Sequence, residues 1–313
     1  MSMPGDPIRD AVSHVQAQSV RDRIELVIVA PDAARVVPDR EILDGFLDWR
    51  VVEWETHDGV GEALAIGFRA ARAPALVYVE EHSYPEPGWA EALIAAHARG
   101  WTAVGPAVMN ANPGSRTSWA SYLLDFGSYP PTRAPGTCAL LPNHQTSYKR
   151  APLLEYGSEL GSLIETETVL QEDLLANGHE LYFEPAARTR HMSVSRLSHF
   201  LVAEYHNCRA FGGSRARRGR WSWRRRLVYI AGAPLIPLLR AYRMLGDLRR
   251  ARVGPLFKPG ILPALACGLL AATVGEVAGY AFGAGDAPHR RVSFELDRRS
   301  YTREADRSDR TQE

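Results

Sequence analysis

The sequence has 313 residues, a net charge of +1 and an apolar content of 45%. This length and composition allow one large or two modest domains with a sizeable core, and the near-neutral charge gives no global field that would favour nucleic acid. The three cysteines lie far apart without a C-x-x-C pair, which argues against a disulfide framework or a zinc ribbon and fits a reducing compartment. The first residues contain no apolar segment of the kind found in secretory signals.

Apolar strands and helices alternate along the first two thirds of the chain. A helix is expected at 7–20, and the near-continuous apolar run at 24–32 is typical of a buried parallel strand. Further strands are expected at 49–55, 75–81, 101–109 and 179–191, and helices at 40–49, 57–74, 88–100 and 164–178. This alternation predicts a parallel sheet covered on both faces. Residues 110–142 are rich in loop formers, a pattern often found in binding loops.

An acidic triplet, Glu80-Glu81-His82, stands at the end of the strand predicted at 75–81. In open parallel sheets, ligands bind beyond the carboxyl ends of the strands. Alternation along an extended chain puts Glu80 and His82 on one side and Glu81 on the other. Carboxylate oxygen suits Mg²⁺ or Mn²⁺, and an imidazole favours Mn²⁺. The alternative is a solvated strand end with ordinary surface charge.

The order of motifs around this triplet resembles the family-2 glycosyltransferases of the GT-A type. A glycine-rich helix entry, a helix ending in AARAP (70–74), an apolar strand, the triplet and PEPGW (85–89) follow one another. In that family a D-x-D triplet grips the metal and the donor diphosphate. The resemblance therefore implies that Glu80 and His82 are metal ligands and that Glu81 lies at the donor, although the triplet here departs from D-x-D.

Three downstream segments extend the resemblance. The segment NHQTSYKR (143–150) looks like the family's stretch before the acceptor-side helix, and ETETVLQEDLLANG (165–178) is similar to its helix with an E-D start and a final glycine. Aligned on that glycine, the catalytic base falls on Glu167, with Glu165 as the fallback. The segment ending at His191 resembles the strand that delivers a histidine to the metal. The alternatives are a helix-capping role for Glu167 and a turn histidine at His191.

The resemblance also implies a nucleotide-binding role for the acid after the second strand of the family, here Asp32, and for Asp58 and Gly61 at the glycine-rich entry. A turn aspartate and a plain helix cap are the alternatives. If 24–32 is the second strand, the opening strand of the family would lie before residue 1. The implied fold is α/β, with a GT-A-type mostly parallel sheet flanked by helices and without that opening strand.

The composition changes after residue 200. Residues 214–226 carry seven arginines and two tryptophans, a pattern of membrane-surface anchors, although a basic linker or, less well supported, a nucleic-acid site are alternatives. The segment 260–283 is long enough to cross a bilayer core of about 30 Å, but it contains Glu276 and Pro263. The segment 227–245 is expected to lie in the interface. Arginines before the apolar segments place the catalytic domain on the cytoplasmic side.

The sequence thus predicts four parts: an N-terminal segment (1–22), a GT-A-like catalytic domain (23–200), membrane-associated helices (201–285) and a disordered tail (286–313). The predicted function is inverting transfer of a sugar from a nucleotide-diphosphate donor to a hydroxyl acceptor, with a divalent cation, Mn²⁺ or Mg²⁺. A lipid-linked or membrane-proximal acceptor is a conjecture from the predicted membrane attachment. The rival hypotheses are a degenerate GT-A domain that binds a nucleotide-sugar or a partner without catalysis, and a membrane-anchored scaffold that binds no nucleotide.

Overall fold

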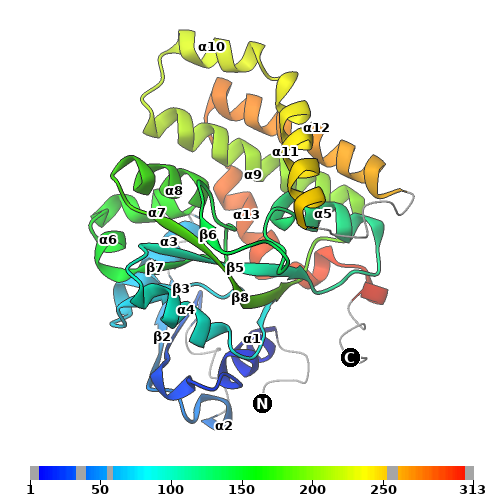
Figure 1. The fold of residues 1–313 in the computed structure, drawn as a ribbon. Coiled ribbons are helices and arrows are strands. Elements are labelled where there is room, and N and C mark those ends of the chain that lie inside the picture. The colour runs from blue at the N-terminus through cyan, green and yellow to red at the C-terminus, as the bar shows by residue number, and fades with distance from the viewer. Residues whose placement is uncertain (1–6, 33–39, 55–58, 252–259, 307–313) are drawn as a thin grey trace. The chain divides into compact units, whose positions relative to one another are not determined.

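The structure is a computed structural model that describes residues 7–32, 40–54, 59–251 and 260–306 (Figure 1). The chain forms two compact units. The sheet unit comprises Met1–Val108 and Ala134–His191, and the helical unit comprises Met109–Arg133 and Met192–Glu313. These ranges differ from the predicted parts, because residues 109–133 group with the C-terminal helices.

Within the described residues, the strands form two sheets. In the first, β1 (Glu25–Ala30) pairs with β2 (Asp48–Glu53). In the second, the order is β3-β7-β5-β8-β4, with β6 paired to β8. Its strands are β3 (Ala75–Val77), β4 (Ser83–Pro85), β5 (Ala103–Asn110), β6 (Gly136–Thr137), β7 (Ser147–Lys149) and β8 (Leu181–His191). Within residues 7–32, no strand precedes β1.

The strand directions are more mixed than the sequence predicts. β1 and β2 are parallel, but β3 and β5 are each antiparallel to β7, and β4 and β6 are each antiparallel to β8. The difference arises at three short strands that were not predicted: β4 and β6, which pair with β8, and β7, which enters the sheet between β3 and β5. Because both neighbours oppose β7, β3 and β5 still run in the same direction, as expected from the strand–helix alternation.

Helices cover the strands of the sheet unit. Helix α3 packs on β1 and β2, α4 packs on β8, and α1 packs on β4. Buried residues of α4, β5 and β8 form one core cluster, centred on Trp89, Leu93 and Val104. The helices of this unit are α1 (Pro7–Gln16), α2 (Arg40–Leu43), α3 (Val60–Ala70), α4 (Trp89–Ala98), α6 (Arg150–Leu154), α7 (Leu160–Ile164) and α8 (Glu167–Ala176). Short 3-10 helices lie at Arg21–Arg23 and Gly157–Glu159.

The strand predicted at 75–81 is shorter in the structure. β3 stops at Val77 because its partner β7 begins at Ser147, which lies opposite Val77 in the register. The chain then leaves the sheet and turns, and the backbone N–H of Ser83 donates to the carbonyl of Glu80 (2.9 Å). The acidic triplet therefore lies on a turn between β3 and β4 and not on a strand.

The helical unit corrects two predictions. Helix α5 (Arg116–Phe126) lies in the stretch expected to be loop, where Ser115 caps it by accepting from the N–H of Ser118. Helix α13 (Ala287–Leu296) lies in the predicted disordered tail, and its Phe294 is buried. The remaining elements are α9 (Leu197–Arg218), α10 (Trp223–Ala231), α11 (Leu235–Ala251), α12 (Ile261–Phe282) and 3-10 helices at Arg298–Tyr301 and Glu304–Asp306.

Helix α12 is the central helix of this unit. It packs on α5, α9, α10 and α11, and its crossing with α9 is close because both helices present glycines there. A Cβ at Gly212 would lie 2.6 Å from the carbonyl oxygen of Glu276. Within the described residues, α12 is the one helix long and apolar enough to cross a membrane, and 44% of its apolar window is buried inside the structure. The length and composition of α12 are consistent with the predicted membrane association.

Candidate active site

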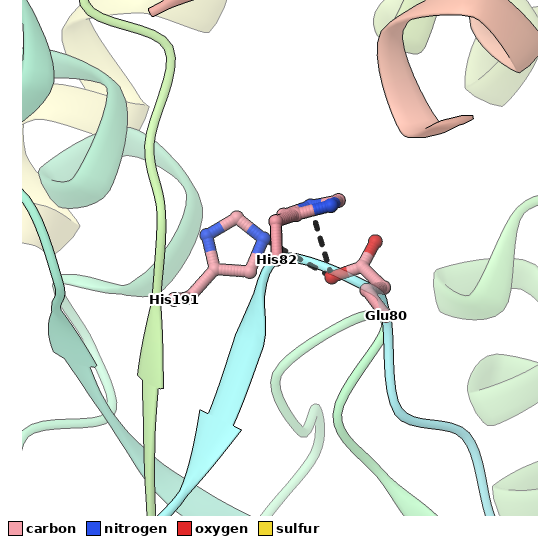
Figure 2. A group of neighbouring side chains, drawn as sticks. All are labelled: Glu80, His82 and His191. Atoms are coloured by element: carbon pink, nitrogen blue, oxygen red, sulfur yellow. Dashed lines mark ion pairs between the residues drawn. The ribbon is translucent and has the colours of Figure 1, made fainter. Parts of the chain in front are cut away.

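Three side chains of the sheet unit meet at one carboxylate oxygen (Figure 2). Oε2 of Glu80 lies 3.5 Å from Nε2 of His82 and 3.1 Å from Nε2 of His191. The two imidazole rings meet edge to face with their centroids 4.8 Å apart. All three side chains are buried. The metal ligands predicted from the sequence, Glu80, His82 and His191, do lie together.

The backbone brings these residues together through the pairing of β4 and β8. Ser83, the first residue of β4, lies opposite His191, the last residue of β8. His82 therefore precedes β4 at the point where β8 ends, although the two histidines are far apart in the sequence. The turn hydrogen bond from Ser83 to Glu80 fixes the third side chain. The predicted placement of Glu80 and His82 on one side is thus reached through a turn.

Glu80 also accepts hydrogen bonds from neighbouring polar groups. Gln145 Nε2 donates to Oε2 of Glu80 (3.1 Å) and to the hydroxyl oxygen of Ser83 (2.8 Å). The hydroxyls of Tyr78 and Ser83 lie 3.4 and 3.3 Å from the carboxylate oxygens. Hydrogen bonds to a carboxylate favour its ionised form, so this environment offsets the cost of burying the charge.

The predicted base, Glu167, begins helix α8 and is buried. The hydroxyl of Tyr148 donates to its Oε1 (2.7 Å), and the backbone N–H of His144 donates to its Oε2. Burial and the charge of Glu167 raise the pKa of Tyr148 well above its usual value, so the tyrosine keeps the proton that it donates. Both oxygens are therefore oriented by partners outside the helix, which a simple N-terminal cap would not require.

His144 links the two carboxylates. Its N–H binds Glu167, and its ring Nδ1 lies 3.5 Å from Oε1 of Glu80. Its φ of +65° is in the left-handed region, which non-glycine residues rarely adopt. Backbone strain of this kind persists only where the surroundings hold it, and it clusters at functional sites.

The chemistry of the donor set fits a divalent cation. One carboxylate oxygen and two imidazole nitrogens lie within 4.8 Å of one another. A set with two imidazoles suits Mn²⁺ better than Mg²⁺, which prefers oxygen ligands.

The other predicted residues do not join this group. Asp58 lies outside the described residues, and Asp32 follows β1 at the end of the two-stranded sheet. Glu81 lies on the same turn between Glu80 and His82 and is half-buried. Gly61 packs on α7, where its N–H donates to Oε2 of Glu165 (2.6 Å). Through this bond the carboxylate of Glu165, the alternative base, binds the N-terminal turn of α3.

The structure adds three residues that the sequence analysis did not single out: His144, Gln145 and Tyr148. All three lie in the segment NHQTSYKR, whose family resemblance was recognised without assigning roles to these three residues. The signal was a run of polar side chains directly before a short strand. Its meaning depends on β7, because this strand carries Tyr148 into the sheet and leaves His144 and Gln145 at the strand entrance.

Residues 5–157 match glycosyl transferase family 2. This match, which spans just under half of the chain, supports a family-2-like GT-A fold. The predicted resemblance is confirmed, and with it the prediction that the chain is a glycosyltransferase. Glu80 and His82 lie inside the matched residues, whereas Glu167 and His191 lie beyond them, so the roles of all these residues stay predictions.

One solved structure, a mannosyltransferase, supports the GT-A fold. The mannosyltransferase PcManGT from Pyrobaculum calidifontis, solved with GDP-Man and Mn²⁺, is 15% identical with a TM-score of 0.50, and the match covers 88% of this chain and 85% of that one. TarS 1–349 from S. aureus, in complex with UDP, gives 15% identity, a TM-score of 0.40 and 88% coverage of both chains.

A third structure, GalNAc-T7 with UDP, GalNAc and Mn²⁺, gives 15% identity and a TM-score of 0.37. The match covers 54% of this chain and 43% of that one, so the chain spans less than half of its length. No curated protein matches the sequence.

Proposed function

We propose that this glycosyltransferase moves a sugar from a nucleotide-diphosphate donor to a hydroxyl acceptor with inversion at the anomeric carbon. The family 2 domain supports sugar transfer from a nucleotide-sugar in general. The observation that carries the specific proposal is the arrangement of Glu80, His82 and His191 around one point, joined to Glu167 through His144.

Glu80, His82 and His191 would hold a divalent cation on the donor side. When bound, the cation supplies positive charge that offsets the negative charge gained by a leaving diphosphate. The donor set favours Mn²⁺, and PcManGT was solved with this ion and GDP-Man. We retain Asp32, Asp58, Gly61 and Glu81 as proposed contacts of the nucleotide.

Glu167 would accept the proton of the acceptor hydroxyl. A general base must present an ionised, oriented oxygen to that proton. The hydrogen bonds from Tyr148 and His144 hold the carboxylate, which has lone pairs left after accepting both. A mechanism with one base and no enzyme nucleophile is a single displacement, which inverts the anomeric centre.

One observation favours a second candidate, a domain that binds a nucleotide-sugar without catalysis. Gln145, Ser83 and Tyr78 hold Glu80, and Tyr148 and His144 hold Glu167, so both carboxylates already have partners within the protein. A purely structural network would have the same appearance.

We further propose that the enzyme is associated with a membrane, with its catalytic domain on the cytoplasmic side and a lipid-linked or membrane-proximal acceptor. Support comes from the arginines that precede the apolar C-terminal segments and from the length of α12. No role for nucleic acid is proposed.

The test is nucleotide release by the full chain from a panel of UDP-, GDP- and dTDP-sugars with Mn²⁺, in the presence of membrane lipid extract. We expect release from one donor class, and an inverted anomeric configuration in the product by NMR. Glu167→Gln should lower the rate at least 100-fold while leaving nucleotide binding intact. Glu172→Gln, on the same helix, is the matched control and should stay active.

Nucleotide binding without turnover by the wild-type chain would favour the second candidate. A product with retained configuration would overturn the single displacement.

A further inference from the structure

Helix α11 carries an apolar stripe that faces away from the helical unit. Leu235, Leu238, Leu239 and Tyr242 lie at spacings of three and four residues, so they share one helix face. Their exposed fractions are 66%, 67%, 48% and 77%. In a helix of a globular domain, such a stripe normally packs on the core.

The opposite face of α11 explains this orientation. Arg240 points inward, where its Nη2 donates to Oε2 of Glu276 on α12 (2.8 Å) and its Nη1 donates to Sγ of Cys208 on α9 (3.4 Å). Met244, four residues further along the helix, is also buried. The pair is partly buried, with the Arg240 side chain 32% and the Glu276 side chain 7% exposed. Removing one partner would leave the other charge uncompensated, so the pair holds α11 with Arg240 inward and its leucines outward.

The preceding helix, α10, also carries exposed apolar side chains. Trp223, Leu227 and Val228 lie within about one turn of one another, and all are largely exposed. No residue of α10 is buried, although Tyr229 and Ile230 pack against the Trp221–Tyr280 cluster. The inner side of α10 is thus used for packing, and its outer side presents further exposed apolar side chains. An apolar surface of this extent marks an interaction site.

Positive charge accompanies this surface. Arg217, Arg218, Arg220, Arg224 and Arg243 are exposed, and no Asp or Glu occurs from residue 214 to residue 246. A protein partner with an apolar groove would not require arginines at these positions. A bilayer with anionic headgroups requires both features, because the apolar side chains enter the acyl boundary and the arginines meet phosphates.

We infer that α10 and α11 form a docking surface for the interface of an anionic lipid bilayer, with α11 lying in the membrane plane. In this arrangement α12 is the interior helix that carries the docking surface, as its packing on four other helices and its ion pair with Arg240 indicate. The inference narrows the proposed membrane association to interfacial binding. It does not depend on sugar transfer, because its test measures binding alone.

The experiment is sedimentation of the purified full chain with vesicles of phosphatidylcholine, with and without 30% phosphatidylglycerol (about one third anionic lipid, enough for a strong surface potential). We expect binding to the anionic vesicles that weakens with salt. Replacing Arg217, Arg218 and Arg224 by glutamine should weaken it by about fivefold per arginine. Arg72→Gln, a well-exposed arginine of the sheet unit, should leave binding unchanged.

A matched pair of variants tests the apolar contribution to vesicle binding. Leu238 and Leu47 are equally exposed, at 67%, and Leu47 belongs to the sheet unit. Leu238→Asp should lower vesicle affinity at least tenfold, since it puts a carboxylate into the acyl boundary. Leu47→Asp should have no effect. Because both sites are exposed, both variants should keep the circular dichroism spectrum of the wild type.

Three results would overturn the inference. Equal binding by Leu238→Asp and wild type would show a purely electrostatic surface, and tighter binding to single-stranded DNA than to vesicles would assign the arginines to nucleic acid. Retention of the expressed chain in cell membranes after washing at pH 11, with release only by detergent, would indicate a spanning helix.

Discussion

The backbone N–H of His144 donates a hydrogen bond to the carboxylate of Glu167, and it does so from a left-handed backbone conformation. The same residue places its ring beside Glu80. One strained position therefore joins the candidate base to the candidate metal group. This relationship makes the site a single connected unit and gives two ways to perturb it, through the backbone and through the ring.

His144→Gly and His144→Ala separate these two effects. Both variants lose the ring, but only alanine keeps the steric cost of a positive φ. We expect the glycine variant to unfold at the higher urea concentration, with a free energy of unfolding about 1 kcal/mol greater than that of the alanine variant. The loss of Mn²⁺ affinity should be similar in both. Equal stability of the two variants would contradict the account of strain at His144.

Tyr148→Phe tests whether Tyr148 holds Glu167 for catalysis. Removing the hydroxyl takes away one hydrogen bond to the carboxylate, and this loss disfavours the ionised form. We expect a kcat at least tenfold lower at pH 6 and a rising limb of the kcat–pH profile that moves to higher pH. The profile is the decisive measurement, because a defect in packing alone would lower kcat equally at every pH.

Stability of the sheet unit should fall in acid because of His97. Burial lowers the pKa of His97 to about 4, and its ring nitrogens lie beside Ser147 Oγ (2.8 Å) and the carbonyl of Trp101 (3.2 Å). The unfolded chain binds the proton near pH 6.5, so it binds more protons than the folded chain between pH 6.5 and 4. The free energy of unfolding should therefore fall across this window, by about 3 kcal/mol at most.

Hydrogen exchange of the peptides that cover residues 89–104, corrected for the intrinsic rate, measures this effect. His97→Gln should flatten the dependence of the free energy of unfolding on pH. A wild-type profile that is already flat from pH 7 to pH 4 would contradict a buried neutral histidine.

The helical unit should respond to pH in the opposite direction. Burial raises the pKa of Asp125 to about 7, against the lowering effect of Arg298. Because the folded chain then binds more protons than the unfolded chain between pH 3.8 and 7, stability is lost as pH rises through 7. Asp125→Asn should raise the free energy of unfolding at pH 8 by roughly 1–3 kcal/mol and change little at pH 4. Thermal unfolding at both pH values measures this, with Asp286→Asn as the exposed control.

Much of the sheet unit follows from the sequence because its signals are local. The apolar runs that become β1, β2, β3 and β5 need only their own composition and flanking turns. The metal group could also be predicted from the sequence, since the resemblance assigned Glu80, His82 and His191 to one site. The shared side of Glu80 and His82 was predicted for an incomplete reason, because the chain reaches it through a turn set by the pairing of β4 with β8.

The missed features depend on contacts between distant segments. The three-residue strand β7 has no periodicity to detect, yet its insertion decides where β3 ends and where His144 lies. The apolar stripe of α11 was recognised as interfacial in composition, but its outward direction is set by the ion pair between Arg240 and Glu276. Glu276, which counts against a membrane span in the sequence, is the partner that orients the docking helix.

The metal site is tested by binding of Mn²⁺ and a nucleotide-sugar to Glu80→Gln, with Glu81→Gln as the neighbouring control for Mn²⁺ affinity. Titration of the full chain, with electron paramagnetic resonance to count free Mn²⁺, measures the metal, and calorimetry measures the nucleotide with Mn²⁺ and with chelator. We expect metal-dependent nucleotide binding by wild type, an unchanged Mn²⁺ affinity in Glu81→Gln, and a loss of at least tenfold in Mn²⁺ affinity in Glu80→Gln. Equal Mn²⁺ affinity in all three proteins, or nucleotide binding that the chelator does not weaken, would contradict a metal site at Glu80, His82 and His191.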